Sequence, residues 1–233
     1  AELLRRLCRI DGIEWIRLHY AYPAAFPDDV IEVMASEPKI CKYLDIPFQH
    51  ISDAQLTAMH RRHTKAEALA LIARLRAAIP DLALRTTLLV GYPGETEADF
   101  AELMEFVRDV RFERLGVFAY SEEEGTFSAR ELHDDVPDEV KQQRVERIME
   151  LQHTISLENN LRRVGRIERV IIDSRQGDFY VGRTQYDSPE VDQEILIPAA
   201  ERRLLRGHFY EVRIDRGADY DLYGHVEAPR PRK

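Results

Sequence analysis

Between residues 15 and 120, short apolar runs alternate with longer stretches in which apolar residues recur every three or four positions. The short runs are typical of β-strands, and the longer stretches are typical of helices that bury one face. The predicted strands are 15–20, 43–48, 82–90 and 114–120, and the predicted helices are 28–36, 52–60, 65–79 and 97–110. Strands separated by helices of this length predict right-handed crossovers and an α/β fold with a parallel sheet.

Two of the helix starts have a local chemical cause. Thr64 with Glu67, and Thr96 with Asp99, have the spacing of a capping box, in which side chains bind backbone N–H groups at the start of a helix. In the helix after Thr64, the apolar residues follow a 3.6-residue period and predict one buried stripe. This stripe consists of Ala68, Leu71, Ile72 and Leu75.

Beyond residue 165 the pattern changes to short alternating runs separated by glycines. These runs are 166–173, 178–183, 194–198, 208–215 and 222–227. Five short strands in so short a segment predict a small antiparallel barrel of the OB-like kind. A long helix from about Pro137 to about Arg163 joins the two patterns. We therefore predict an α/β domain at 1–158 that includes the linker helix, a β-barrel domain at 160–228, and a basic, Pro-rich tail at 229–233.

Charge is unevenly distributed along the chain. The 233 residues carry 33 Lys and Arg against 42 Asp and Glu, a formal net charge of −9. Residues 1–159 hold 19 basic and 29 acidic side chains, so the remaining 14 and 13 leave residues 160–233 at +1. A protein that binds a nucleic-acid backbone usually carries a basic stripe. The acidity therefore favours a basic protein partner over nucleic acid.

The loops that follow the predicted strands are where a parallel sheet binds ligands. Gly91 and Gly94 lie between a strand and a helix start, where backbone N–H groups could approach a ligand, although an ordinary glycine turn has the same pattern. Gln49 and His50 directly follow another strand. They could bind or titrate there, but a histidine held by hydrogen bonds within the loop is the commoner case.

A basic cluster and an acidic stretch have similar double interpretations. Residues 60–63 read His-Arg-Arg-His within an acidic segment. They could hold an anion, but a solvated helix end, which favours cations, explains them equally well and is preferred. In residues 177–194, one Arg183 stands among five carboxylates. Such a stretch would attract a basic protein, or it could simply be a solubilising loop.

The chain resembles a known family through three segments. IPFQH, TTLLVGYPGETEADF and FAYSEEEGTFSA occur in the order seen in the radical S-adenosylmethionine methylthiotransferases. Residues 160 to 228 are similar to the TRAM domain of that family. YLDIPFQHI at 43–51 and GRTQYDSPEVD at 182–192 resemble the branch that modifies a ribosomal protein rather than tRNA, with Ser188 and Val191 as mild departures.

This resemblance implies chemistry that the chain by itself does not complete. Members bind S-adenosylmethionine and two four-iron four-sulfur clusters that an electron donor reduces, one cluster being held by a C-x3-C-x2-C motif. The chain has two cysteines, Cys8 and Cys41, and neither has that spacing. We therefore expect a C-terminal piece of the enzyme, inactive alone, from a cytoplasmic protein. No apolar run approaches the roughly 18 residues that span a membrane.

The resemblance also implies site residues, although no catalytic residue and no metal ligand is predicted within the chain. The expected cofactor-binding residues are Gln49, His50, Arg85, Gly91, Pro93, Gly94, Glu95, Tyr120 and Ser121. The residues expected to contact a basic protein of the small ribosomal subunit are Arg183, Asp187, Glu190 and Asp192. The implied reaction is methylthiolation of the β-carbon of an aspartate. A tRNA-adenosine methylthiotransferase and a cofactor-free protein-interaction module remain alternatives.

Overall fold

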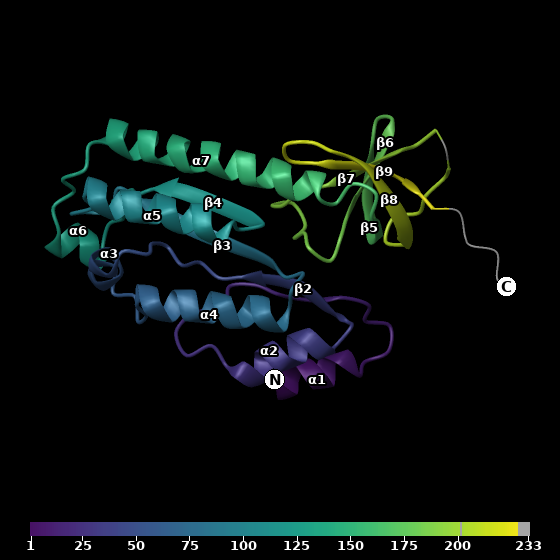
Figure 1. The fold of residues 1–233 in the computed structure, drawn as a ribbon, viewed down its shortest axis with the longest axis horizontal. Helices are drawn as coiled ribbons and strands as arrows, with labels where there is room; N and C mark the ends of the chain where they lie inside the picture. Colours follow the sequence, from purple (N-terminus) through teal and green to yellow (C-terminus); the bar gives the residue numbers. More distant parts are fainter. Residues whose placement is uncertain (201, 228–233) are drawn as a thin grey trace. The chain divides into compact units, whose positions relative to one another are not determined.

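A four-stranded parallel sheet organises the first part of the chain in the computed structural model, which describes residues 1–200 and 202–227 (Figure 1). The sheet order is β1-β2-β3-β4, and every adjacent pair is parallel, as predicted. Its strands are β1 (Ile16–Leu18), β2 (Ile40–Asp45), β3 (Ala83–Val90) and β4 (Arg114–Ala119).

Seven helices occur among the described residues. They are α1 (Glu2–Cys8), α2 (Asp28–Ser36), α3 (Asp53–Ala58), α4 (Lys65–Ala78), α5 (Glu97–Val110), α6 (Phe127–Glu131) and α7 (Asp138–Leu161). The short helix α6 was not predicted, because five residues are too few to show a helical period. Its start is marked locally by Thr126, whose hydroxyl accepts the N–H of Ala129.

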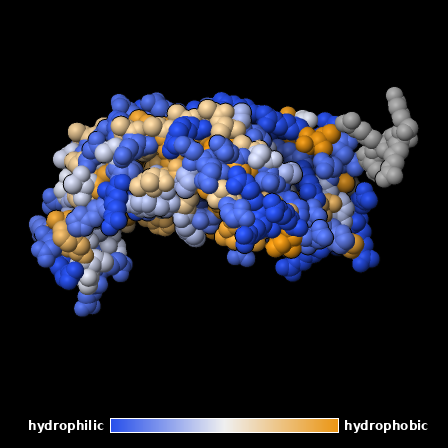
Figure 2. All heavy atoms as spheres, turned by 90° about the horizontal axis from the view of Figure 1, so that it is seen from below, coloured by the Kyte–Doolittle hydropathy of each residue, from blue (hydrophilic) through white to orange (hydrophobic). Residues whose placement is uncertain are grey.

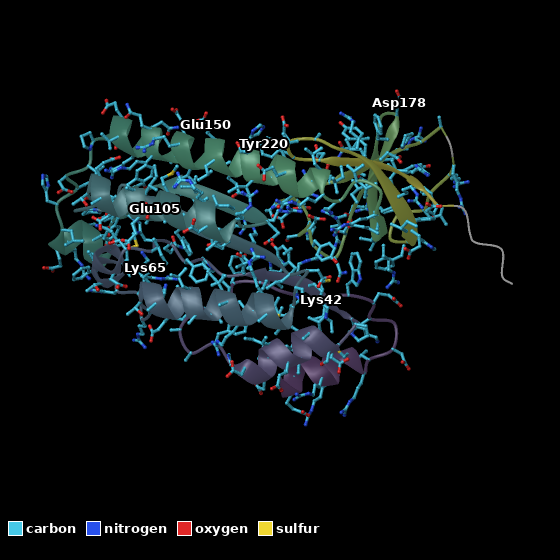
Figure 3. All side chains as sticks on the ribbon, in the orientation of Figure 1. Lys42, Lys65, Glu105, Glu150, Asp178 and Tyr220 are labelled. Atoms are coloured by element: carbon cyan, nitrogen blue, oxygen red, sulfur yellow. The ribbon has the colours of Figure 1, made fainter. Side chains whose placement is uncertain are left out.

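The two predicted capping boxes are confirmed. Thr64 accepts the N–H of Glu67 at 3.3 Å, and the Glu67 carboxylate accepts the N–H of Thr64 at 2.8 Å. Thr96 and Asp99 make the same reciprocal pair at 3.2 and 2.9 Å. Lys65, labelled at the start of α4 in Figure 3, reaches Glu102 on α5 at 2.6 Å. Local sequence therefore sets where α4 and α5 begin.

The faces of β3 differ in burial. The side chains of Thr86, Leu88 and Val90 are fully buried. Close to this core, the ring of Phe48 packs edge-on against Phe106 of α5, with ring centroids 5.8 Å apart. Residues that alternate along a strand point to opposite faces, and the alternating residues 85, 87 and 89 are only partly buried. This second face of the sheet is the one with room for polar contacts.

The second part of the chain forms a closed five-stranded barrel, as predicted. Its strands are β5 (Ile167–Gln176), β6 (Phe179–Arg183), β7 (Ile195–Pro198), β8 (Phe209–Gly217) and β9 (Leu222–Val226). The barrel order is β5-β6-β7-β9-β8. All pairs are antiparallel except β7 with β9. The prediction of a wholly antiparallel barrel is wrong in this detail, because a closed ring with an odd number of strands needs one parallel pair.

The two parts separate as compact units at residue 152, inside α7. The sequence places the boundary at 158–160. The predicted basic tail at 229–233 lies outside the described residues. Figure 2 shows one face of the molecule, on which hydrophilic side chains predominate and hydrophobic ones are scattered. Within the described ranges, no helix combines the length and the hydrophobicity that a membrane span requires.

Candidate functional site

The loops at the carboxyl edge of the sheet turn sharply through residues with positive φ. Tyr20 follows β1 with φ 55°, Gln49 follows β2 with φ 69°, and Gly91 follows β3 with φ 73°. The N–H of Gln49 donates to the Thr87 carbonyl at 2.9 Å, and its own carbonyl accepts the N–H of Leu89 at 2.7 Å. These two hydrogen bonds hold the main chain of Gln49 against β3 and so fix the position of its Cα atom, from which the side chain extends.

His50 and Glu95 form a buried side-chain contact that links two of these loops. Both side chains are fully buried, with His50 Nε2 3.4 Å from Glu95 Oε1. His50 Nδ1 accepts the Ser52 N–H at 3.0 Å, so Nε2 carries the proton of the neutral ring and faces the carboxylate. Arg144 of α7 lies 3.1 Å from Glu95 Oε2, and the N–H of Gly91 donates to the same carboxylate. These contacts leave neither predicted residue open to a ligand.

Gly91 and Gly94 are each required in this loop for a different structural reason. A Cβ on Gly91 would lie 2.2 Å from Cγ of Lys141, so the close approach there is made by a side chain of α7. Gly94 has φ +80° and open space around it, and its N–H donates to Asp135 at 2.7 Å. Pro93 between them is buried. The ordinary strand-to-helix turn therefore accounts for both glycines.

The remaining predicted cofactor residues lie nearby in different settings. Arg85 on β3 pairs through Nη1 with both carboxylate oxygens of Asp45 on β2, at 3.3 Å each. Tyr120 is 7 % exposed, and its ring packs edge-on against Tyr92 with centroids 5.1 Å apart. Ser121 is exposed. Arg85 is in register with the first residue of β4, away from the carboxyl edge, so of these residues Ser121 is the one that keeps an exposed polar group there.

A pocket of about 300 Å³ lies at this edge. Its walls are Gln49, Leu89 and Tyr92 at the strand ends, residues 58–61 after α3, and residues 126–128 at the start of α6. Among the nine predicted cofactor residues, Gln49 is the one that lines it. The sequence did not indicate the contributions from α3 and α6, because the elements that meet here are far apart along the chain.

The pocket walls carry fixed aromatic and cationic groups. His60, with φ 55°, packs against Phe127 with ring centroids 4.2 Å apart. The Arg61 guanidinium donates through Nη2 to the Pro47 carbonyl at 2.7 Å and lies over the Tyr22 ring, 4.9 Å from its centroid. Within residues 1–200 and 202–227, no acidic side chain lines the pocket. The site is therefore suited to a ligand with hydrogen-bond acceptors or negative charge.

In the barrel, Asp187 belongs to a buried ionic network and not to the surface. The Asp187 side chain is 0 % exposed and lies 3.9 Å from Nη1 of Arg163. The hydroxyl of Thr184 donates to Asp187, and Arg163 Nε donates to Glu168 at 2.9 Å. Burial acts to lower the pKa of Arg163, but its bonds to Glu168 and the charges of Asp187 and Glu168 outweigh this and raise it. This network was not predictable from the sequence, since no local pattern distinguishes a buried Arg163 from a solvated one.

The other predicted barrel residues differ in how far they reach solvent. Arg183 Nε lies 2.9 Å from Asp173, so its charge is partly offset. Glu190 is exposed with φ 68°. Asp192 is partly buried, and its carboxylate accepts the Ser188 N–H at 2.8 Å. Of the predicted acidic contacts, Glu190 is the one that projects freely from this loop.

Comparison with known families and proteins matches both parts of the chain. Residues 1–107 match the radical SAM superfamily, and residues 164–226 match the TRAM domain. The chain is 53% identical over 225 residues to the ribosomal protein uS12 methylthiotransferase RimO of Phocaeicola vulgatus, covering 97% of this chain and 52% of that protein. It is 54% identical over 224 residues to RimO of Flavobacterium johnsoniae, covering 96% and 51%. The chain spans about half the length of these relatives.

The fold has a counterpart among solved structures. Coproporphyrinogen III oxidase HemN from Escherichia coli, described as a radical SAM enzyme, matches with a TM-score of 0.51 and 15% identity, over 79% of this chain and 50% of that one. This likeness concerns the fold alone. The identity to the RimO proteins extends over nearly the whole chain, and the two family matches cover residues 1–107 and 164–226 within it. The chain therefore carries a radical SAM region and a TRAM region, and it is similar to the RimO proteins over the half of their length that it spans.

Proposed function

We propose that this chain is part of a radical SAM enzyme that methylthiolates the β-carbon of an aspartate in ribosomal protein uS12. The observation that carries the proposal is the identity of more than half of the aligned residues to proteins named for that activity. Because the ribosome is cytoplasmic, we place the enzyme in the cytoplasm. The whole enzyme would use S-adenosylmethionine and two four-iron four-sulfur clusters, with an electron donor to reduce them.

We propose that S-adenosylmethionine binds at the carboxyl edge of the sheet, outside the small pocket, where partly or fully exposed polar side chains are available. The cofactor, when bound, supplies the radical that removes a hydrogen atom from the substrate carbon. We propose that Gln49 and Ser121 hold its polar groups, because each keeps a partly or fully exposed side chain at this edge. Arg85, expected to join them, lies near the start of β3, in register with the first residue of β4, and is paired with Asp45. His50 and Glu95 instead hold the loops together, since their bonds are made within the protein.

The described residues offer no equivalent fit for a cluster. Over 1–200 and 202–227, no three side chains of His, Cys, Asp or Glu come together in a way that could hold a metal. We therefore assign no cluster ligand to this chain and derive no step through a cluster.

We propose that the barrel contributes to recognition of uS12 through the exposed side of the 183–192 loop. Glu190 supplies a free negative charge there, with Arg183 and Asp192 beside it in the sequence. Charge complementarity of this kind speeds association with a basic partner more than it strengthens the final complex. Asp187, which is fully buried, would act by holding the loop and not by touching the partner.

A chimera tests the activity directly. This chain would replace the aligned segment of the Flavobacterium johnsoniae RimO protein, and mass spectrometry would follow the target aspartate of uS12 in cells that lack their own enzyme. We expect the methylthio group to appear. A folded, cluster-loaded chimera that leaves uS12 unmodified would contradict the proposal.

Binding separates the protein substrate from the tRNA alternative. Fluorescence anisotropy with labelled uS12 and labelled tRNA would compare their affinities for the isolated chain. We expect uS12 to bind more tightly. Binding of tRNA without binding of uS12 would place the chain with the tRNA-modifying branch instead.

A further inference from the structure

The basic segment at residues 60–63 is not one solvated helix end. Helix α3 ends at Ala58, so the segment lies beyond it. His60 and Arg61 line the strand-edge pocket, and Arg62 is exposed. His63 is 5 % exposed and packs edge-on near Tyr22. The structure thus separates four adjacent residues into different environments and directs two of them to a cavity.

Arg61 is a fixed cation without a carboxylate partner among the described residues. Its contacts are the Pro47 carbonyl, which accepts from Nη2 at 2.7 Å, and the face of Tyr22. A carbonyl and an aromatic ring orient a guanidinium but leave its charge uncompensated. Arg61 is thus a positively charged lining residue of the pocket in a segment that carries ten more acidic than basic residues.

The rest of the pocket suits a small ligand with one anionic end. Ser128 and Thr126 bring hydroxyl groups, while the packed rings of His60 and Phe127 form an apolar wall. A volume of about 300 Å³ is at the small end of the range for ligand pockets. It matches an acidic side chain with its neighbouring peptide better than it matches a large cofactor.

We propose that this pocket binds the target aspartate of uS12, with Arg61 holding its carboxylate and the His60–Phe127 wall packing on the adjoining peptide. The inference rests on the proposed function. Gln49, proposed to contact S-adenosylmethionine, borders the same pocket, so an aspartate bound there would place its carbon beside the cofactor. Arg61 is then a substrate-binding residue, and it selects a carboxylate over an amide.

The test is a double-mutant cycle across the proposed contact. Affinities of the chain and of its Arg61→Gln variant would be measured for uS12 and for uS12 with the target aspartate changed to asparagine. A charge-assisted hydrogen bond to a carboxylate predicts a loss of about tenfold for either single change and little further loss for both together. Arg62→Gln removes the same charge from an exposed neighbour, and we expect it to change affinity less than twofold.

A second variant keeps the test valid if Arg61→Gln fails to fold, since the contacts of Arg61 also support the loop. Phe127 is 41% exposed, so Phe127→Asp places a carboxylate at the pocket wall at little structural cost. Both forms lose the packing on this ring, and we expect uS12 to lose at least tenfold more affinity than the asparagine form, because only the aspartate is repelled by the new carboxylate.

The outcomes distinguish this inference from the proposed function. Tight binding of uS12 that does not respond to Arg61→Gln, Phe127→Asp or the aspartate change would overturn the inference and leave the function standing. Failure of every form of the chain to bind uS12 would overturn both. Loss of S-adenosylmethionine affinity in Arg61→Gln with unchanged uS12 affinity would assign the pocket to the methionyl carboxylate of the cofactor and overturn the inference.

Discussion

Replacing Gly91 by alanine probes how α7 is held against the turn after β3. Gly91 has φ +73°, and a Cβ there would lie 2.2 Å from Cγ of Lys141. Cγ is near the root of the side chain, so the lysine must move as a whole. Its far end is held by Asp134 at 2.6 Å and by Asp138 at 3.2 Å. The substitution therefore breaks contacts as well as straining the backbone.

The magnitude has two parts. A left-handed alanine costs about 1–2 kcal/mol relative to glycine. Displacing Lys141 loses its bond to the half-buried Asp134, and a hydrogen bond between charged groups contributes about 1.5–3 kcal/mol. The bond to Asp138 adds little, because that carboxylate is 94% exposed. We expect Gly91→Ala to destabilise the first unit by about 3 kcal/mol in total.

Gly94→Ala is the matched control. Gly94 has φ +80° and nothing within 4 Å of the new Cβ, so we expect a loss of only about 1 kcal/mol. Urea unfolding followed by the fluorescence of Trp15, the single tryptophan, reports on the first unit. Adding Lys141→Ala should remove most of the difference between the two variants. Equal losses for both glycine substitutions would refute the clash with Lys141.

Three further predictions concern buried and exposed charges. Glu168→Gln leaves Arg163 in the barrel without its main partner and should cost about 3 kcal/mol, seen as faster hydrogen exchange in β5. Burial, and then the charge of Arg61, lower the pKa of His63, so only the unfolded chain takes up that proton as pH falls below about 6.5. The first unit should therefore lose stability between about pH 7 and pH 5, and His63→Met should flatten this dependence in urea titrations. Glu190→Gln should weaken uS12 binding by about twofold to threefold in low salt and not in high salt.

Each of these predictions has a control. Glu158→Gln removes the exposed partner of Arg162 and should cost no more than about 0.5 kcal/mol, so a similar loss to that of Glu168→Gln would contradict the buried network. If the free energy of unfolding of His63→Met still fell with pH as steeply as that of the unchanged chain, another group would be responsible. Glu32→Gln, an exposed change on α2, should leave uS12 binding unaltered.

The positions of the helices and strands were predictable because their signals are local. Thr64 and Glu67 lie three residues apart, and their capping box forms whatever the rest of the chain does. The alternation of strands with helices left a parallel sheet as the expected arrangement, and the five short runs after residue 165 closed into a barrel. Helix α6 escaped prediction because a single turn has no period to detect.

Sequence position alone did not reveal which candidate residues face a ligand. Gln49 and His50 are neighbours, yet Gln49 lines the pocket and His50 is fully buried against Glu95, 45 residues away. In the acidic loop, Asp187 is inside the barrel and Glu190 is outside. The residue type gives the charge of a side chain, but its burial depends on which other segments of the folded chain pack against it.

The local elements, the order of strands and helices, and the family that the chain resembles could all be predicted without a structure. These follow from short-range patterns and from motifs that are recognised in the linear sequence. Only the folded chain shows that residues near 49, 60 and 127 enclose one pocket, and that Arg61 has no carboxylate partner there among the residues that the structure describes. The physical reason is that a pocket is made by contacts between distant segments, and such contacts exist only once the chain has folded.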